Sequence, residues 1–192
     1  MYARLIATLL QKTDYPRWRD PRSLESWWAT RTEELAAFVP KGSRVIEFGA
    51  GNRILERYLE PSCTYVASDI IDRGPGTIIC DLNRRPLPDL EAGVFDVAVF
   101  IGVLEYVRDV PSVLDWLTPR VSCCLLSYVC ADANSRPLLG IPEAFRRMKM
   151  GWMNGYREEE IRELFSKRGF NSIRESTWKN NRLFFFSRAM HS

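Results

Sequence analysis

Hydrophobic and polar positions change their spacing several times along the chain, and each change marks a boundary between predicted elements. Over the first 40 residues the apolar positions recur at helical spacing. The pattern predicts a short helix over residues 2–12 and a second over residues 23–38 with Ser23 as its N-cap, because the prolines between them interrupt helical geometry. We therefore expect a helical N-terminal segment that ends near Pro40.

Short apolar runs separated by turn residues follow this segment. Strands are expected over residues 45–48, 64–68, 77–80, 95–101 and 121–129, and helices over residues 54–59 and 110–117. The strands are apolar at successive positions, which is typical of strands buried on both faces in a parallel sheet covered by helices. The predicted fold class is α/β, doubly wound.

The last third of the chain departs from this alternation. A helix over residues 158–168 ends at Gly169, and strands over residues 171–178 and 182–187 follow with no helix between them. The asparagines in the connection at 179–181 tolerate the positive φ of a tight hairpin turn. The sequence thus predicts seven strands in a mostly parallel sheet that ends in a C-terminal antiparallel hairpin.

The composition fits one folded domain and excludes several kinds of site. The 192 residues are 46% hydrophobic with a net charge of +3, and the basic residues are scattered, which makes nucleic acid an unlikely partner. The five cysteines lack C-x-x-C spacing and are expected to be free thiols. Because His191 is the single histidine, we expect no His-rich metal site, no metal, and no Ser-His-Asp or Cys-His catalysis.

The apolar runs are too short for a membrane span, which needs about 20 residues. Residues 5–10 are also shorter than the core of a signal peptide, which is about 7–15 residues long. We therefore expect a cytoplasmic protein in a reducing compartment, without membrane attachment.

A glycine-rich turn directly follows the first predicted strand. Its sequence is Glu47-Phe48-Gly49-Ala50-Gly51-Asn52. Glycines at this spacing let the backbone approach a ligand closely, and the N-terminus of the next helix offers free N–H groups. A tight turn without a ligand is the alternative interpretation of so short a motif.

Acidic residues end the next two predicted strands. Asp69 lies 18 residues after Gly51, where a doubly wound fold places a carboxylate that binds ribose hydroxyls, and Asp72 is a nearby competitor for this role. Asp81 ends the third strand and is expected at the same edge of the sheet, within reach of a purine amino group. A solvated loop or an Asx turn would explain each aspartate by itself.

From Arg44 to about Ser187 this arrangement resembles the class I S-adenosylmethionine-dependent methyltransferases, which have a Rossmann-like fold. The stretch from Phe95 to Val107 is similar to the fourth strand of that family and its F-D-x-V…V-L-E-H-V continuation, and residues 156–170 resemble its late helix. The resemblance implies one domain over residues 1–192, with an N-terminal helical cap (1–40) covering a core (44–188). It implies S-adenosyl-L-methionine as cofactor, bound by Glu47, Gly49, Ala50, Gly51, Asp69, Ile70, Asp81, Leu82 and Ile101.

Two positions depart from the family pattern. Arg53 stands where a third glycine is often found, and Tyr106 stands where many members that act on small molecules have histidine. A histidine base is thus absent at this position, and Tyr106 is the candidate catalytic residue, with packing of the following helix as its alternative role. Other residues that could accept a proton near this edge are Glu105, Tyr128, Asp132 and Tyr156.

The segment over residues 131–155 is long for an irregular connection and predicts a binding loop or lid. Its basic residues Arg146, Arg147 and Lys149 could contact an anionic acceptor or form a solvated helix face. The N-terminal aromatic residues could close the pocket or pack a covering helix; they are Tyr15, Trp18, Trp27 and Trp28. We expect the acceptor to be a small molecule, such as a sugar or another polar biosynthetic intermediate.

Three other functions are alternatives to methylation of a small molecule. A methyltransferase-like domain could bind a nucleoside or a protein partner without catalysis. An NAD(P)-dependent oxidoreductase would need its last fingerprint glycine at position 54, which is Ile54, and a parallel sixth strand. Nucleic-acid methylation is disfavoured because Ile101-Gly102 replaces the N/D-P-P-Y/F motif after Phe100.

Overall fold

The computed structural model describes residues 2–24, 26–131 and 143–188, with side chains described from residue 6 onward. The strands are β1 (Arg44–Phe48), β2 (Thr64–Asp69), β3 (Ile78–Ile79), β4 (Val97–Ile101), β5 (Cys123–Tyr128), β6 (Phe170–Trp178) and β7 (Asn181–Arg188). The helices are α1 (Tyr2–Leu9), α2 (Tyr15–Arg19), α3 (Ala29–Ala36), α4 (Ile54–Tyr58), α5 (Val110–Leu117), α6 (Glu143–Met150) and α7 (Glu158–Ser166), with short 3-10 turns at Pro21–Ser23, Ser26–Trp28, Leu104–Tyr106 and Thr118–Arg120.

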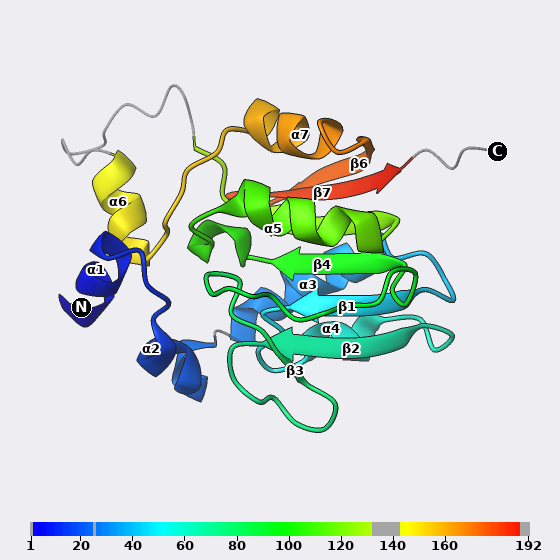
Figure 1. The fold of residues 1–192 in the computed structure, drawn as a ribbon, viewed down its shortest axis with the longest axis horizontal. Coiled ribbons are helices and arrows are strands. Elements are labelled where there is room, and N and C mark those ends of the chain that lie inside the picture. Colours follow the sequence, from blue (N-terminus) through cyan, green and yellow to red (C-terminus); the bar gives the residue numbers. More distant parts are fainter. Residues whose placement is uncertain (1, 25, 132–142, 189–192) are drawn as a thin grey trace.

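The strands form one sheet in the order β3-β2-β1-β4-β5-β7-β6. The pairs from β3 to β5 are parallel, and β7 runs antiparallel to both of its neighbours. The predicted seven-stranded, mostly parallel sheet with a C-terminal hairpin is therefore confirmed. Figure 1 shows that the carboxyl ends of β1, β2 and β4 point toward α1, α2 and α6.

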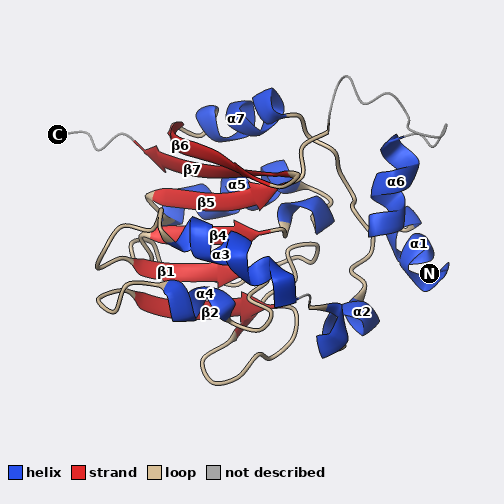
Figure 2. Cartoon of the chain, turned by 180° about the vertical axis from the view of Figure 1, so that it is seen from behind, coloured by secondary structure: helices blue, strands red, loops and turns tan. Residues whose placement is uncertain are grey.

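Helices cover both faces of the sheet, which explains why its strands are apolar at successive positions. Ile46 and Phe48 of β1 belong to the core under α5 and α7, whereas Val45 belongs to the core under α3 and α4. Figure 2 shows α3 and α4 in front of the sheet and α5 behind it. Each fully buried aliphatic side chain contributes about 1.5–3 kcal/mol, so these two layers hold the strands in place.

The N-terminal helices differ from the predicted ones. The helix expected over residues 23–38 is broken into the 3-10 turn Ser26–Trp28 and α3, because the turn packs its indoles into a tertiary cluster. Trp27 stacks on Trp178 at 5.4 Å and packs edge-on against Trp28 at 6.2 Å, and Arg31 lies beside Trp28 and Trp178. The prolines do not simply separate helices. Pro16 occupies the first turn of α2, where a missing N–H costs little, and Asp14 caps that helix.

Two further predictions about local structure were wrong. The segment over residues 131–155 is not irregular throughout, because Glu143–Met150 form the helix α6; its use as a binding loop or lid stays a prediction. In the hairpin, Lys179 takes the positive φ of 51°, whereas Asn181 is already the first residue of β7. Asp132, a predicted proton acceptor, lies outside the described residues.

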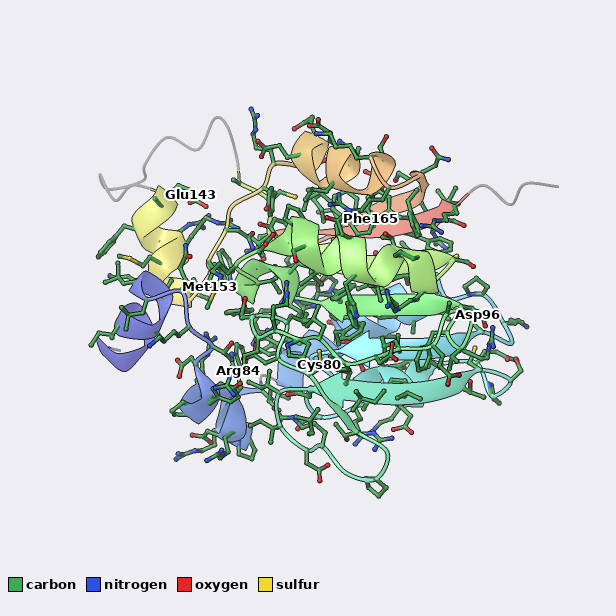
Figure 3. The ribbon with its side chains drawn as sticks, viewed as in Figure 1. Cys80, Arg84, Asp96, Glu143, Met153 and Phe165 are labelled. Carbon is green, nitrogen blue, oxygen red and sulfur yellow. The ribbon has the colours of Figure 1, made fainter. Side chains whose placement is uncertain are left out.

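No helix in the described ranges is long and apolar enough to cross a membrane. Figure 3 shows Met153 and Arg84 toward the end of the sheet that faces α1, α2 and α6, and Asp96 at the opposite end. The residues that were predicted from the sequence to bind a ligand lie at or just after the carboxyl ends of strands, at the same end of the sheet as Met153.

Candidate functional site

A cavity of about 530 Å³ opens at the carboxyl edge of the sheet, under the N-terminal segment. All ten site residues predicted from the sequence line it: Glu47, Gly49, Ala50, Gly51, Asp69, Ile70, Asp81, Leu82, Ile101 and Tyr106. The end of a parallel sheet brings them together from four different strands, as expected for a doubly wound fold.

The glycine-rich turn takes a conformation that only glycine adopts readily. Gly49 has a φ of +68°, and a Cβ atom there would lie 2.5 Å from Cγ2 of Val103. The N–H of Gly51 donates a 2.9 Å hydrogen bond to Oδ2 of Asp69, which joins the turn to the end of β2. Arg53, which replaces the third glycine, also has a positive φ of 53° and pairs with Glu56 at 3.0 Å. The turn is therefore formed without a third glycine.

Glu47 is the buried acid at the end of β1. Its Oε2 accepts a 2.6 Å hydrogen bond from the Tyr65 hydroxyl, and its exposure is 4%. Burial raises the pKa of Glu47 to about 8, although the Tyr65 hydrogen bond opposes this shift. The carboxyl group is thus poised to change charge near neutral pH.

Asp69 is engaged by an arginine that sequence reasoning missed. Nε of Arg73 lies 3.1 Å from Oδ2 of Asp69, and the N–H of Ile71 donates to Oδ1. Arg73 also donates to the carbonyl of Trp18, so it joins Asp69 to the N-terminal segment. The i, i+4 spacing from an acid at a strand end was the available sequence signal for Arg73.

Asp81 is held by the same N-terminal segment. Its carboxylate accepts hydrogen bonds from the hydroxyl of Thr13 at 2.9 Å, the hydroxyl of Tyr15 at 2.7 Å and the N–H of Asn83. Residues 12–18 thus cover the end of the cavity formed by β2 and β3. We call this segment the N-terminal cap.

Tyr106 lies on the other side of the cavity, in contact with the cap. Its ring packs edge-on against Trp18 at 4.9 Å, and its hydroxyl lies 3.5 Å from Nη2 of Arg17. Arg17 also donates to the carbonyl of Met150, at the end of α6. Burial raises the pKa of Tyr106, so its hydroxyl keeps its proton at neutral pH.

The basic residues of α6 do not form a common binding face. Arg147 is buried and donates to the carbonyls of Asn154 and Val129 and to the hydroxyl of Tyr128, while Arg146 pairs with Glu143. The suggestion that Arg147 meets an anionic acceptor is therefore wrong, since its guanidinium is used to fix α6 on β5.

Asn154 completes this anchoring. Its amide donates to the carbonyls of Leu104, the first residue of the 3-10 turn that carries Tyr106, and of Val107, which follows that turn. Tyr128 and Tyr156, two other predicted proton acceptors, are not among the residues that line the cavity. Instead the Tyr128 hydroxyl accepts from the N–H of Tyr156 and contacts Asn154.

The model of the family described as "methyltransferase domain" matches residues 16–175. The chain belongs to the methyltransferase domain family. The match begins within the cap, at residue 16, and includes the glycine-rich turn and the sheet as far as the middle of β6. The predicted resemblance to class I methyltransferases is confirmed. A search of curated proteins found no match.

Solved methyltransferase structures share the fold of this domain. A protein of Nostoc punctiforme described as an O-methyltransferase is 12% identical with a TM-score of 0.71, covering 96% of this chain and 66% of its own. Mitomycin 7-O-methyltransferase is 17% identical with a TM-score of 0.67, and the match covers 97% of this chain and 60% of that protein. Magnesium protoporphyrin IX methyltransferase of Synechocystis, solved with bound S-adenosylhomocysteine, is 15% identical with a TM-score of 0.63. That match covers 97% of this chain and 100% of the Synechocystis protein. The chain spans 54–66% of the length of the first four structures it matches.

Proposed function

We propose that this methyltransferase domain transfers a methyl group from S-adenosyl-L-methionine to a small-molecule acceptor. The observation that carries the proposal is the lining of one cavity by the Gly49–Gly51 turn and the acids Glu47, Asp69 and Asp81. Structural relatives solved with S-adenosylhomocysteine or S-adenosylmethionine support the choice of cofactor.

The residues of the cavity fit this cofactor. A Cβ at Gly49 would collide with Val103, so glycine is needed for the close packing of the turn against the residues after β4, and the backbone of the turn lines the cavity. Carboxylates at Asp69 and Asp81 accept hydrogen bonds, as ribose hydroxyls and a purine amino group require. We propose that Ala50, Ile70, Leu82 and Ile101 contact the same ligand through their backbone and apolar atoms.

The bound cofactor supplies a methyl group that is already activated by a sulfonium. The protein then has to exclude water and to orient the acceptor, and no nucleophilic side chain is needed. Trp18, Trp152 and Met153 provide apolar walls to the cavity near Tyr106. We propose that Tyr106 contacts the acceptor as a hydrogen-bond donor, because its raised pKa keeps the proton on the hydroxyl.

The acceptor class rests on the size of the site. The cavity of about 530 Å³ lies within the usual range for small-molecule sites, about 300–1,000 Å³. Mitomycin 7-O-methyltransferase and human N-acetylserotonin methyltransferase, both named for small molecules, share the fold. We propose a small-molecule acceptor that shares this cavity with the cofactor, with a sugar or another polar metabolite as the first class to screen.

Calorimetric titration with S-adenosylhomocysteine tests the proposal, with NAD as the comparison. We expect one-to-one binding of S-adenosylhomocysteine, weakened at least tenfold in Asp69→Ala, because Asp69 holds both the turn and the ligand. Asp72→Ala is the matched control, since Asp72 is exposed to solvent and makes a local bond to Gly74. Binding of NAD alone would overturn the proposal, and binding of neither would favour a non-catalytic domain.

We also propose a reducing, cytoplasmic location. Support comes from the five cysteines, which are all unpaired. Thiol titration of protein purified without reductant should give five free thiols, and an intramolecular disulfide would contradict the proposal.

A further inference from the structure

Arg31 of α3 is a buried cation at the cavity wall. Its side chain is 7% exposed, and Nη1 donates a 3.1 Å hydrogen bond to the amide oxygen of Asn181. Its Nε has no hydrogen-bond partner, and no acid within 4.0 Å pairs with Arg31, among the residues that the structure describes. The guanidinium lies beside the indole rings of Trp28 and Trp178, at 5.6 and 5.8 Å.

Glu105 is a buried acid in the wall of the same cavity. Its exposure is 2%, and Oε1 accepts a 3.0 Å hydrogen bond from the N–H of Val129. Oε2 is buried and has no partner within the described part of the chain. Burial raises the pKa of Glu105, while Arg31 and Arg147 act in the opposite direction. Oε2 of Glu105 therefore lacks a hydrogen-bond donor and Nε of Arg31 lacks an acceptor, although the charges of the two groups act on each other through space.

A buried polar atom without a hydrogen-bond partner is unfavourable, so the unpartnered Nε of Arg31 and Oε2 of Glu105 beside one cavity indicate a ligand that satisfies both. We infer that Arg31 and Glu105 form the acceptor subsite, which binds a small molecule carrying an anionic oxygen group for Arg31 and an O–H or N–H for Glu105. The inference rests on the proposed function and specifies its substrate class. A carboxylate is the simplest such anion, because its two oxygens match the planar guanidinium.

The strand order separates this subsite from the acids proposed to bind the nucleoside. Nη1 of Arg31 lies 3.0 Å from the position that a Cβ of Gly102 would take, directly after β4, and its partner Asn181 begins β7. Asp69 and Asp81 follow β2 and β3, on the opposite side of β1. The glycine-rich turn after β1 thus lies between the nucleoside end of the cavity and Arg31.

The position of Glu105 also gives the transferred proton a destination. The acceptor oxygen or nitrogen forms a bond to the methyl carbon while the carbon–sulfur bond breaks, and the electron pair of that bond remains on sulfur. The proton lost by the acceptor passes to Oε2 of Glu105. Products are the methylated acceptor, S-adenosylhomocysteine and protonated Glu105, so atoms and charge balance.

Paired probes that differ only in the anionic group test the inference. Wild-type protein saturated with S-adenosylhomocysteine is titrated with 3-hydroxybenzoate and 3-hydroxybenzamide, and with glucuronate and glucuronamide. We expect the carboxylate of at least one pair to bind tenfold or more tightly than its amide, and this preference to fall below twofold in Arg31→Met. Equal binding within both pairs, or no binding of any probe, would overturn the inference.

Controls separate this inference from the proposed function. Arg57→Met, on the exposed face of α4 and outside the cavity lining, should keep the wild-type preference. Arg31→Met should bind S-adenosylhomocysteine within threefold of wild type; a tenfold loss would assign Arg31 to the cofactor and overturn the acceptor subsite. Failure of wild type to bind S-adenosylhomocysteine would instead refute the proposed function.

Arg31→Lys provides a second test if the methionine variant does not fold, because it keeps the charge but loses the forked geometry. We expect it to retain a reduced preference for the carboxylate, and an unchanged preference would contradict the role of the guanidinium. For Glu105→Gln we expect binding of the favoured carboxylate within threefold of wild type but methyl transfer at least tenfold slower. A transfer rate equal to wild type would exclude Glu105 as the proton acceptor.

Discussion

The Tyr15 hydroxyl donates a 2.7 Å hydrogen bond to Oδ2 of Asp81, which ties the N-terminal cap to the end of β3. Burial, followed by the bond to Asp81, raises the pKa of Tyr15 to about 12. The tyrosine therefore remains a donor throughout the physiological pH range. Because Asp81 also accepts from Thr13, two neighbouring residues of the cap depend on one carboxylate.

Removing this hydroxyl should loosen the cap without removing a cavity wall. In Tyr15→Phe we expect S-adenosylhomocysteine to dissociate roughly tenfold faster, since a hydrogen bond to a charged group contributes about 1.5–3 kcal/mol and part of that is offset by water. Stopped-flow tryptophan fluorescence measures the rate. Tyr58→Phe, on the exposed side of α4, is the control, and a Tyr15→Phe rate equal to wild type would show that the cap does not limit release.

The buried carboxyl of Glu47 predicts a pH-dependent stability. Its pKa is about 8 in the folded protein against an ordinary value of 4.5, so the folded state binds a proton that the unfolded chain has released. This group's contribution to the free energy of unfolding therefore decreases as pH rises from about 4.5 to about 8. Glu47→Gln removes this pH dependence. The melting temperature of the variant relative to wild type should therefore increase by on the order of 5 °C as the pH rises from about 4.5 to about 8.

Thermal unfolding at pH 5 and at pH 8.5 measures this difference. The exposed Glu33→Gln variant on α3 is the control and should follow wild type at both pH values. A constant gap between Glu47→Gln and wild type would mean that Glu47 has an ordinary pKa.

The ion pairs of Glu175 predict the opposite pH dependence. Glu175 on β6 pairs with Arg162 of α7 at 2.8 Å and with Arg182 of β7 at 2.9 Å, and these contacts lower its pKa to about 2. The stabilisation is present above pH 4.5 and is lost as pH falls toward 2. Glu175→Gln should lower the free energy of unfolding by about 1 kcal/mol at pH 7, because the pairs are partly exposed.

Urea unfolding at pH 7 and at pH 3 tests this prediction, and the loss should shrink at the lower pH. Glu163→Gln is the matched control, since Glu163 pairs with Lys167 on the exposed face of α7. An equal loss at both pH values would indicate that the packing of the Glu175 side chain, not its charge, is responsible.

Alanine substitutions at Gly49 and Gly93 distinguish the cost of backbone strain from the cost of a steric clash. Both residues have a positive φ, +68° at Gly49 and +76° at Gly93. A Cβ atom at Gly49 would lie 2.5 Å from Val103, whereas a Cβ atom at Gly93 would have no neighbouring atom within 4 Å. Gly93→Ala should cost about 1 kcal/mol. Gly49→Ala should cost about 1–3 kcal/mol more, because overpacking is added to the strain. Equal costs in chemical denaturation would show that Val103 moves away freely.

Local sequence signals were sufficient where an element's ends are set by its own residues. The helix predicted over residues 110–117 is α5, because Asp109 caps its N-terminus and four of its residues form one buried face. The acids and glycines of the cavity could be predicted for a similar reason. They follow directly after strands, and the ends of parallel strands meet at one edge whatever the details of packing.

Tertiary contacts decided the rest. The break between Ser26–Trp28 and α3 follows from where the adjacent indoles of Trp27 and Trp28 pack, which no local propensity contains. Arg147 reads as a surface residue in a polar helix, yet it is buried against Val129 and Asn154. The cysteines were predicted to be free thiols, and all five are free; packing decides that Cys80 and Cys124 are buried while Cys63, Cys123 and Cys130 are partly exposed.

The amino-acid sequence by itself determined the sheet, its hairpin and the acids that line the cavity, since periodicity and turn chemistry act over a few residues. The tertiary structure alone decided that Arg31 and Glu105, 74 positions apart, are both buried in the wall of one cavity. Which polar groups lose water and which find partners depends on the packing of α3 against β4 and β7. No local pattern in the chain specifies that packing.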